Sequence, residues 1–508
     1  IPYHNVSWLG WCVTGAPAAM VKHTGDPNVH MLLNLDPSGD GRLEKVWEVN
    51  CPAPTQTADA LAANNDPLGN TGGYQLLSLQ RFDPNAVSLL RNISLSDEDK
   101  QYFQSTGCCP VSRKGWSMDP EAIIDEIKAS MLRGCGGAGF PTHLKWRAVR
   151  KQPDSLGKIV VINADEGLPS TFKDLHLMAD PACRMRLISG ACLAAHVVGA
   201  RSIVMYLRYE YKNLRPALLA AFQLYTTKLN PHIGRASSSL PLAFDVVLGG
   251  GPYVCGEETA LFESVEGQMP QARSLRNIFP TEHGLFGKPT LVGNVETFSW
   301  IPSIVYRGAA AFASPIKTSS PLQLPLGNGG FGAKLLSICG DSTRPKLAEF
   351  PLGTPLKTIL TETADLPLAE IAAVEVGGIL EPLVSLGTQA AADLDRPLTL
   401  DGSANSLPAG GSVVVFSKKN FDERQIFTAK GKFCHVESCQ LCAPCRDGSR
   451  VMRRNIGDIL QGTLSPVKRN ALSELAAAME CSSNCGHGKG CGKLVQSMLR
   501  HSANLSPK

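Results

Sequence analysis

Lys158-Ile159-Val160-Val161-Ile162-Asn163-Ala164-Asp165-Glu166-Gly167 is the stretch that decides the fold of this chain. Its apolar, β-branched part is typical of a strand buried on both faces. Amide and acidic side chains follow at the carboxyl end of the strand, where α/β folds place ligand-binding groups. Asn163, Asp165 and Glu166 are therefore candidate partners of a flavin ring or a ribose. An Asx turn with solvated acids is the alternative.

Predicted helices and strands alternate on the C-terminal side of this segment. They comprise a helix near Ala182–Val198, a strand at Ser202–Leu207, a helix near Leu214–Leu229 and a strand at Phe244–Leu248. Such alternation predicts a parallel α/β sheet.

A further helix is predicted upstream. Asp119 is its N-cap, and a proline occupies the first helical position. Ile123, Ile127 and Met131 recur at fourfold spacing, so we expect one buried face and a helix end at Gly134.

A glycine-rich loop follows this helix and reads Arg133-Gly134-Cys135-Gly136-Gly137-Ala138-Gly139-Phe140. Its backbone N–H groups can form a concave nest for an anion. Lysine, arginine and tryptophan side chains come directly after it, which suits a nucleotide or flavin phosphate. The loop is not a GxGxxG dinucleotide motif, because no strand precedes it and the spacing differs. A simple tight turn is the alternative.

A second glycine-rich segment, Gly249-Gly250-Gly251-Pro252-Tyr253-Val254-Cys255-Gly256-Glu257-Glu258-Thr259, follows the strand at 244–248. Acids in a first helical turn are ordinary partners of the helix dipole. That account explains Glu257 or Glu258, but it does not explain the glycines before them.

Four cysteines near the C-terminus have the spacing of a cubane iron–sulfur site. Cys439, Cys442 and Cys445 are separated by two-residue gaps, and Cys485 follows after thirty-nine residues. A [4Fe–4S] cluster takes such a triplet with one remote ligand. A structural zinc site is the competitor, but it usually takes two pairs of ligands. Cys481 and Cys491 are rival candidates for the fourth ligand.

Composition limits the function classes. Charged residues make up 19% and the formal net charge is +4, so nothing indicates a nucleic-acid partner. The sequence contains no uninterrupted run of eighteen apolar residues, so we predict no membrane-spanning helix. Sixteen cysteines scattered through a large chain favour a reducing cytoplasm over a disulfide framework.

Taken together, the motifs resemble a known family, the NADH-oxidising flavoprotein subunit of respiratory complex I. Its soluble relatives are the diaphorase subunits of NAD-dependent formate dehydrogenases and NAD-reducing hydrogenases. The matching segments are RGCGGAGFPTHLKW (133–146), NADEGLPSTFKD (163–174), YLRYEY (206–211), GPYVCGEETALFESVEG (251–267), GLFGKPTLVGNVET (284–297) and ESCQLCAPCRDGS (437–449). They occur in the family's order over about residues 115 to 500.

The resemblance implies three cofactors: FMN, NAD(H) and one [4Fe–4S] cluster. The residues it implies for FMN are Gly134, Gly136, Gly137, Ala138, Lys145, Asn163, Asp165, Glu166, Tyr253, Gly256, Glu257, Glu258, Asn294 and Thr297. Phe140, Arg276 and Phe279 would contact NAD(H), with Glu258 beside the nicotinamide as the catalytic residue. Cys439, Cys442, Cys445 and Cys485 would hold the cluster.

This chain departs from the family at several of these positions. Leu168 stands where an acid usually contacts the NADH ribose, and Arg276 replaces a lysine. Cys135 and Gly293 replace an arginine and an asparagine, and Gln440 replaces a glycine. Because a carboxylate would repel the 2′-phosphate of NADP(H), its loss at residue 168 leads us to expect that NADP(H) is tolerated.

We therefore expect an α/β fold in four parts. Residues 1–115 form an N-terminal extension, compatible with a degenerate thioredoxin-like domain. Residues 116–330 form a Rossmann-like FMN-binding domain, 331–420 a ubiquitin-like β-grasp domain, and 421–508 a helical bundle with the cluster. A Pro- and Gly-rich stretch at 314–332 and strands at Leu335–Cys339 and Val413–Phe416 support these boundaries.

The expected function is that of a diaphorase (β) subunit in a soluble, cytoplasmic NAD-dependent formate dehydrogenase. Its partners would be a molybdenum or tungsten catalytic subunit and a small [2Fe–2S] thioredoxin-like subunit. An NAD-reducing hydrogenase or an NADH-quinone oxidoreductase is the first alternative. A non-catalytic iron–sulfur relay or scaffold is the second.

Overall fold

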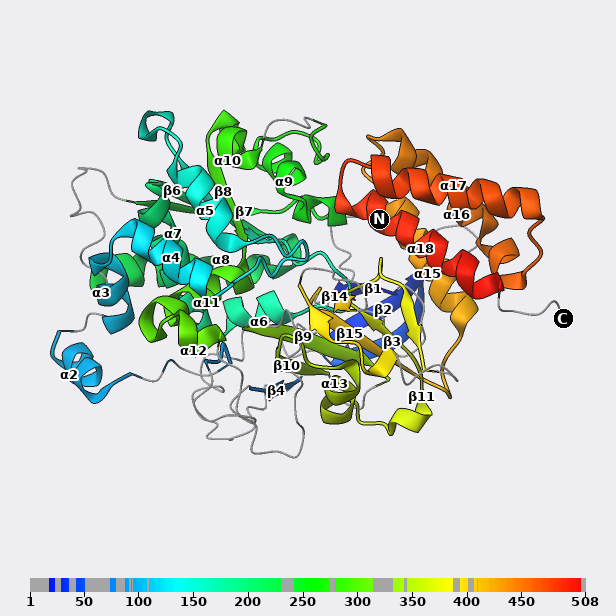
Figure 1. Cartoon of the computed structure of the whole chain (residues 1–508), viewed down its shortest axis with the longest axis horizontal. Helices are drawn as coiled ribbons and strands as arrows, with labels where there is room; N and C mark the ends of the chain where they lie inside the picture. The colour runs from blue at the N-terminus through cyan, green and yellow to red at the C-terminus, as the bar shows by residue number, and fades with distance from the viewer. Residues whose placement is uncertain are drawn as a thin grey trace.

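The computed structural model in Figure 1 describes most of the chain from residue 109 onward and isolated segments before it. The described residues are 18–22, 29–35, 43–50, 74–78, 87–90, 93, 95–106, 109–229, 242–274, 279–313, 332–341, 345–386, 393–400, 406–408 and 410–503. None of the helices in these ranges combines the length and the apolar character that crossing a membrane requires.

A four-stranded parallel sheet forms the centre of the first large domain. Its order is β7 (Ala243–Leu248), β6 (Ser202–Leu207), β5 (Ile159–Ala164) and β8 (Thr290–Asn294). All three strands predicted for this region are present. Because side chains alternate along a strand, Val160 and Ile162 enter the main core while Val161 enters a smaller core on the other face.

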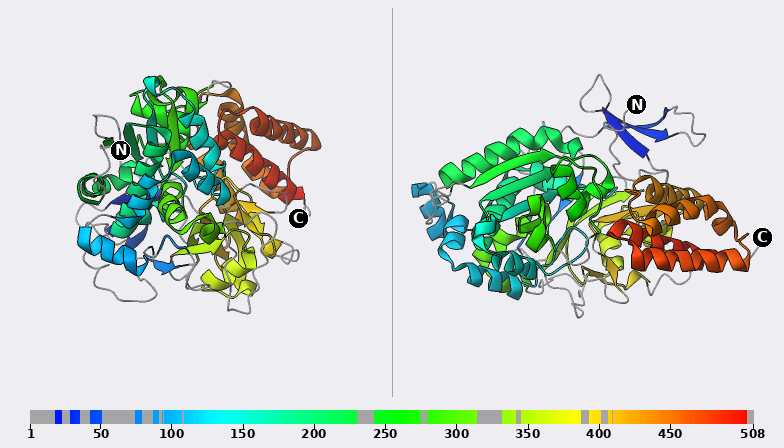
Figure 2. Two further views of the ribbon diagram at one scale, coloured as in Figure 1. Left: turned by 60° about the vertical axis from the view of Figure 1, so that its left-hand side comes forward. Right: turned by 90° about the horizontal axis from the view of Figure 1, so that it is seen from above.

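Helices cover both faces of this sheet (Figure 2). The main core is built by α7 (Pro181–Val198) and α11 (Val295–Arg307), whereas α9 (Glu258–Val265) builds the smaller one. The other helices of the domain are α4 (Pro120–Ala129), α5 (Thr142–Arg150), α6 (Lys173–Ala179), α8 (Arg215–Leu224), α10 (Pro280–His283) and α12 (Ala309–Ala313). The predicted α/β sheet is thus confirmed, and the predicted cofactor residues Asn163 and Asn294 lie near the carboxyl ends of β5 and β8.

The helix α4 begins as predicted but ends earlier. Asp119 accepts a hydrogen bond from the backbone N–H of Glu121, and Ile123 and Ile127 are fully buried. Met131 was expected on the same face, and this was wrong. It lies beyond the helix with φ of +56° and its side chain is 49% exposed, because the chain turns there into the glycine loop.

The second domain is a β-grasp sheet, as expected. Its order is β12 (Leu383–Ser385), β11 (Ile371–Val376), β15 (Ser412–Ser417), β9 (Ala333–Gly340), β10 (Lys346–Pro351) and β4 (Gln75–Leu77). The hairpin of β9 and β10 is antiparallel, β15 runs parallel to β9, and α13 (Leu356–Thr363) packs against β10. Two short strands, β13 (Leu398–Thr399) and β14 (Leu407–Pro408), pair beside it.

Four helices form the C-terminal bundle on the right of Figure 1: α15 (Glu423–Val436), α16 (Ala443–Gln461), α17 (Pro466–Ser482) and α18 (Gly486–Ala503). Met452, Leu472, Met479 and Leu494 are among the side chains that close its core. The helical bundle predicted for the C-terminal residues is therefore confirmed.

The residues assigned to the N-terminal extension do not all form a separate unit. Strand β2 (Val29–Leu35) lies between β1 (Ala18–Lys22) and β3 (Leu43–Asn50) in an antiparallel sheet. In contrast, β4 belongs to the β-grasp sheet. Helix α2 (Asp97–Thr106) leads to α3 (Pro110–Ser117), which packs on α7 and α11. A thioredoxin-like arrangement of the first residues stays a prediction.

Candidate functional site

The glycine loop between α4 and α5 is closed at its base and open at its apex. The backbone N–H of Gly134 donates to the carbonyl oxygen of Phe140 at 2.9 Å, and the Arg133 guanidinium donates to Gly139 at 2.9 Å. Gly139 has φ of +60°, and a Cβ there would overlap the Leu400 carbonyl. At the apex, Gly137 has φ of +124°, and a Cβ there would meet none of the described residues within 4 Å. Such a loop can receive an anion on its exposed backbone.

This loop lies against the start of α11, which follows β8. The backbone N–H of Cys135 donates to Oγ1 of Thr297 at 2.9 Å. A Cβ on Gly136 would contact the Asn294 side chain at 3.3 Å. The structure thus brings two segments far apart in the sequence, both predicted to bind FMN, into direct contact.

The acidic loop after β5 contains one saturated and one unsatisfied carboxylate. Glu166 accepts hydrogen bonds from the backbone N–H groups of Asp174 and Leu175 and from the Tyr211 hydroxyl. Asp165 is buried, and neither of its oxygens has a hydrogen-bond partner among the described residues. Burial raises the pKa of Asp165 to about 7, against the opposing effect of Arg208. An unsatisfied buried carboxyl is suited to receive a polar group of a bound ligand.

The second glycine segment also reaches this edge of the sheet. The Asn163 side chain donates to the carbonyl oxygen of Gly256 at 2.9 Å, which ties the two loops together. Glu257 is the N-cap of α9 and accepts hydrogen bonds from Thr259 and Ala260. Glu258 instead forms an ion pair with Lys145 of α5. Glu257 therefore has a structural role that its neighbour Glu258 lacks.

A buried network of charges supports Asn294 from behind. Lys173 pairs with Asp174 at 2.6 Å and with Glu296 at 3.2 Å, and Glu296 also pairs with Lys334 of the β-grasp domain. The Asn294 amide donates to Asp174 at 2.7 Å and accepts from Lys173 at 3.2 Å. The amide is consequently held in one orientation. Sequence reasoning missed this network because its members come from four separate elements.

The two phenylalanines predicted to contact NAD(H) lie at the surface. Phe140 is 47% and Phe279 is 61% exposed, which is unusual for phenylalanine and leaves both rings available for stacking. Arg276 lies outside the described residues. Leu168 is half-buried and lies against Gly378 of the β-grasp domain, where a Cβ would collide with it.

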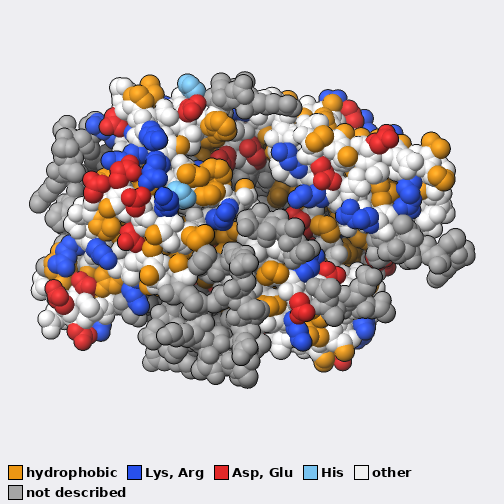
Figure 3. Space-filling view, in the orientation of Figure 1, with side chains coloured by type: hydrophobic (Ala, Val, Ile, Leu, Met, Phe, Trp, Pro, Cys, Tyr) orange, Lys and Arg blue, Asp and Glu red, His pale blue; other side chains and the backbone are white. Residues whose placement is uncertain are grey.

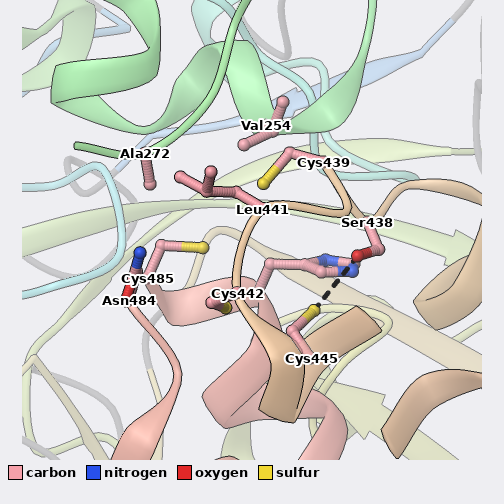
Figure 4. A pocket seen from close by; sticks show the side chains of 10 residues that line it. Val254, Ala272, Ser438, Cys439, Leu441, Cys442, Cys445, Asn484 and Cys485 are labelled. Atoms are coloured by element: carbon pink, nitrogen blue, oxygen red, sulfur yellow. Dashed lines mark hydrogen bonds between the residues drawn. The ribbon is translucent and has the colours of Figure 1, made fainter. Parts of the chain in front are cut away.

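The four predicted cluster cysteines line one pocket (Figure 4). Cys439, Cys442 and Cys445 come from the loop between α15 and α16, and Cys485 comes from the turn before α18. The pocket is completed by Val254, Ala272, Ser438, Leu441, Asn484 and His487. Burial raises the pKa of the Cys445 thiol to about 12, so a bound cation is needed to hold it as a thiolate.

The rival cysteines are placed differently. Cys481 is exposed and bonds to its own helix, whereas Cys491 is fully buried beside His487, at 3.7 Å. Neither lines the pocket. Within the described ranges, no three His, Cys, Asp or Glu side chains gather closely enough to hold one metal ion.

Three hydrogen bonds join the cluster loops to the flavin domain, and one of them reaches the second glycine segment. Glu437 accepts from the backbone N–H of Tyr253 at 2.9 Å. The other two run from Gln271 to the Cys439 carbonyl and from Asn484 to the Ser274 hydroxyl, each at 3.0 Å. The Tyr253 ring also packs against Phe433 and His487, with centroid separations of 5.2 and 5.6 Å. The two predicted cofactor sites are therefore adjacent.

Comparison with known proteins agrees with this geometry. Residues 127–303 match the Nuo51 FMN-binding domain, and residues 427–504 match the iron–sulfur binding region of NADH-ubiquinone oxidoreductase-F. The chain is 33% identical over 433 residues to an NADH-quinone oxidoreductase subunit of Rhizobium meliloti (strain 1021), covering 81% of this chain and 95% of that protein. The chain belongs to the Nuo51 flavoprotein family.

Nuo51 relatives also occur in hydrogenases. The chain is 33% identical to the NAD-reducing hydrogenase HoxS subunit alpha of Cupriavidus necator, over 75% of this chain and 59% of that one. A crystal structure of an NAD⁺-reducing [NiFe]-hydrogenase in the air-oxidised state matches 97% of this chain and 76% of its own chain, with a TM-score of 0.69 and 30% identity. As a Nuo51 protein the chain has FMN and a [4Fe–4S] cluster as cofactors and NAD(H) as substrate, as expected.

Proposed function

We propose that this chain is the diaphorase subunit of a multi-subunit oxidoreductase, in which it exchanges electrons between NAD(H) and one [4Fe–4S] cluster through FMN. The hydrogen bond between Tyr253 and Glu437 is the observation that carries this proposal. It joins the loop that we assign to FMN directly to the loop that we assign to the cluster. Loops for two redox cofactors that are hydrogen-bonded to each other would hold these cofactors near enough to exchange electrons.

We assign roles to the site residues as follows. The open apex of the glycine loop receives the FMN phosphate, and Lys145 adds positive charge beside it. Asn163, Asp165 and Asn294 present polar atoms to the ring, while Thr297 holds the loop in place. Bound FMN supplies the exchange between the hydride of NADH and single electrons.

The exposed rings of Phe140 and Phe279 are proposed to hold the nicotinamide nucleotide over this site. Glu258 would then orient the nicotinamide, because Glu257 is already engaged as a helix cap. Cys439, Cys442, Cys445 and Cys485 serve as the cluster ligands.

The partner complex is a separate proposal. The relatives are named as subunits of an NADH-quinone oxidoreductase and of an NAD-reducing hydrogenase, so a catalytic partner subunit is well supported. A formate dehydrogenase with molybdenum or tungsten in the cytoplasm, and with a small [2Fe–2S] subunit, stays our prediction. Metal analysis of the co-purified large subunit separates the cases, since nickel would indicate a hydrogenase.

The decisive experiment is purification of the protein with its native cofactors. We expect a yellow protein with a flavin absorbance band, iron and sulfide in a ratio of one cluster per chain, and NADH-dependent dye reduction. A colourless protein that retains iron but does not oxidise NADH would instead support the non-catalytic relay.

A further inference from the structure

Helix α16 carries a row of arginines that begins directly after Cys445. Arg446, Arg450 and Arg453 are spaced by four and three residues, so they lie along one side of the helix. Arg450, Arg453 and Arg454 are all exposed. At 1.5 Å per residue, the row extends about 12 Å from the cluster pocket. Figure 3 shows Lys and Arg side chains, with some Asp and Glu side chains among them, over the part of the molecule that the C-terminal helices form.

The positive charge of this row is largely uncompensated. Asp447 pairs with Arg446 at 3.0 Å, but no described carboxylate forms an ion pair with Arg450, Arg453 or Arg454. The neighbouring acid Glu437 is buried and engaged with Tyr253. Cations crowd together here at an energetic cost that an acidic partner would relieve.

The neighbouring helix adds to the same positive field. Burial lowers the pKa of His435, and Arg453, Arg450 and Arg454 lower it further. Burial and then Arg453 lower the pKa of Lys432. Because arginines contribute to both pKa shifts, Lys432 and His435 of α15 must lie close to the arginine row. No acidic side chain contributes to either shift.

Exposed apolar side chains occur on the same two helices and in the loop between them. Val436, Leu441 and Val451 are 43%, 40% and 36% exposed, and Leu441 lies between two cluster cysteines. Arginine together with exposed apolar residues is the composition of protein interfaces, where lysine is depleted. We call Lys432, His435, Arg446, Arg450, Arg453 and Arg454, with these three apolar residues, the arginine face.

We propose that the arginine face is the docking surface for an acidic, one-electron carrier protein that exchanges electrons with the cluster. This inference rests on the proposed function, because the carrier must receive what NADH delivers. Oxidation of one NADH yields NAD⁺, one proton and two electrons, so two carrier molecules are reduced in successive dockings. Complementary charge would steer the encounter and fix its orientation beside the cysteine loop.

The test uses the purified holoprotein with three defined acceptors. Rubredoxin is an acidic one-electron iron protein, cytochrome c is a basic one, and menadione is a neutral small acceptor for flavin-level activity. We expect rubredoxin reduction to weaken as ionic strength rises, because salt screens the attraction. The double variant Arg450→Glu/Arg453→Glu should lower kcat/KM for rubredoxin about tenfold at low ionic strength and leave menadione reduction unchanged.

A matched control has the same change of charge elsewhere. Lys418 and Lys419 are exposed and lie before α15, whose far end leads to the cluster loop about 20 Å away. Lys418→Glu/Lys419→Glu should leave rubredoxin reduction within about twofold. An equal loss in both double variants, or a wild-type preference for cytochrome c over rubredoxin, would overturn the docking proposal.

The remaining outcomes distinguish a failure of the proposed function from a failure of the docking proposal. If the wild-type protein does not reduce menadione with NADH, the proposed function fails on its own. Docking is then still measured by calorimetric titration of rubredoxin into the oxidised protein, and absence of binding overturns it. Tight binding of a labelled DNA duplex that the arginine variant loses, with rubredoxin reduction unaffected, would assign the face to nucleic acid and also overturn it.

Discussion

The carboxylate of Glu437 accepts a hydrogen bond from the backbone N–H of Tyr253 at 2.9 Å. One partner is two residues from Cys439, and the other begins the turn Tyr253–Gly256 beside the predicted FMN site. A hydrogen bond to a buried charged group stabilises its position more strongly than a neutral one. The contact therefore sets how closely the two cofactor loops approach each other.

Replacing Glu437 should slow the transfer of electrons to the cluster without abolishing flavin chemistry. Electron transfer rates fall steeply with distance, so we expect Glu437→Ala to slow NADH-driven cluster reduction, followed by rapid-freeze EPR. Menadione reduction should stay near wild-type. Glu437→Gln keeps an acceptor oxygen and should restore the rate. Equal rates of cluster reduction in all three proteins would contradict a positioning role.

Asp165 should make the flavin-free protein lose stability as pH rises. Its folded pKa of about 7 lies above the ordinary value of 3.8, so the native state binds more protons than the unfolded state between those values. The free energy of unfolding therefore falls from about pH 4 to pH 7, by up to about 4 kcal/mol. Asp165→Asn should flatten this slope and be the more stable protein at pH 8. Urea denaturation of both proteins at pH 5 and pH 8 measures these differences in the free energy of unfolding.

The ion pair between Lys145 and Glu258 allows catalysis to be separated from folding. Both side chains are partly exposed, at 25% and 34%, so the pair contributes about 0–1 kcal/mol to stability. We expect Glu258→Gln to retain FMN but to lower kcat/KM for NADH about tenfold, which corresponds to about 1.4 kcal/mol. Stopped-flow bleaching of the flavin band reports it. Glu257→Gln, at the helix cap, should lower the melting temperature instead.

The fourth cluster ligand can be tested by two serine variants. Cys485 lines the pocket with the cysteine triplet, whereas Cys481 is exposed. Cys485→Ser should remove or alter the EPR signal of the reduced cluster, and Cys481→Ser should leave it intact. The reverse pattern would show that the pocket geometry misassigns the ligand.

Nucleotide preference should be broader than the family pattern predicts. The family resemblance implies that residue 168 lies beside the nucleotide ribose, where an acid would repel a 2′-phosphate and Leu168 would not. We expect NADPH to support dye reduction, and Leu168→Glu to reduce that activity while sparing NADH. Wild-type kinetics with a strong preference for NADH would exclude this.

Much of this arrangement could be predicted from local sequence. Each of the successful signals lies within a few consecutive residues. They are the buried run at Ile159–Ile162, the helix cap at Asp119 and the spacing of the cysteine triplet. The early end of α4 was missed because Met131 has the spacing of a helix but adopts a positive φ. The role of Glu437 and the network around Lys173 depend on residues more than a hundred positions apart, which no local pattern reports. The side-chain oxygens of Glu166 accept hydrogen bonds from the backbone N–H of Asp174 and from the Tyr211 hydroxyl, and the contact of Glu166 with the flavin stays a prediction.

The short strand Gln75–Leu77 has a consequence for how the molecule is made. It closes the edge of the β-grasp sheet by pairing with Lys346–Ala348, about 270 residues later. Without it, the outer edge of β10 would be an open template for pairing with other chains. During synthesis the early segment must wait until the β-grasp domain has emerged from the ribosome. Completion of the β-grasp sheet is thus a late event, and we expect a variant lacking residues 74–78 to aggregate as it is produced.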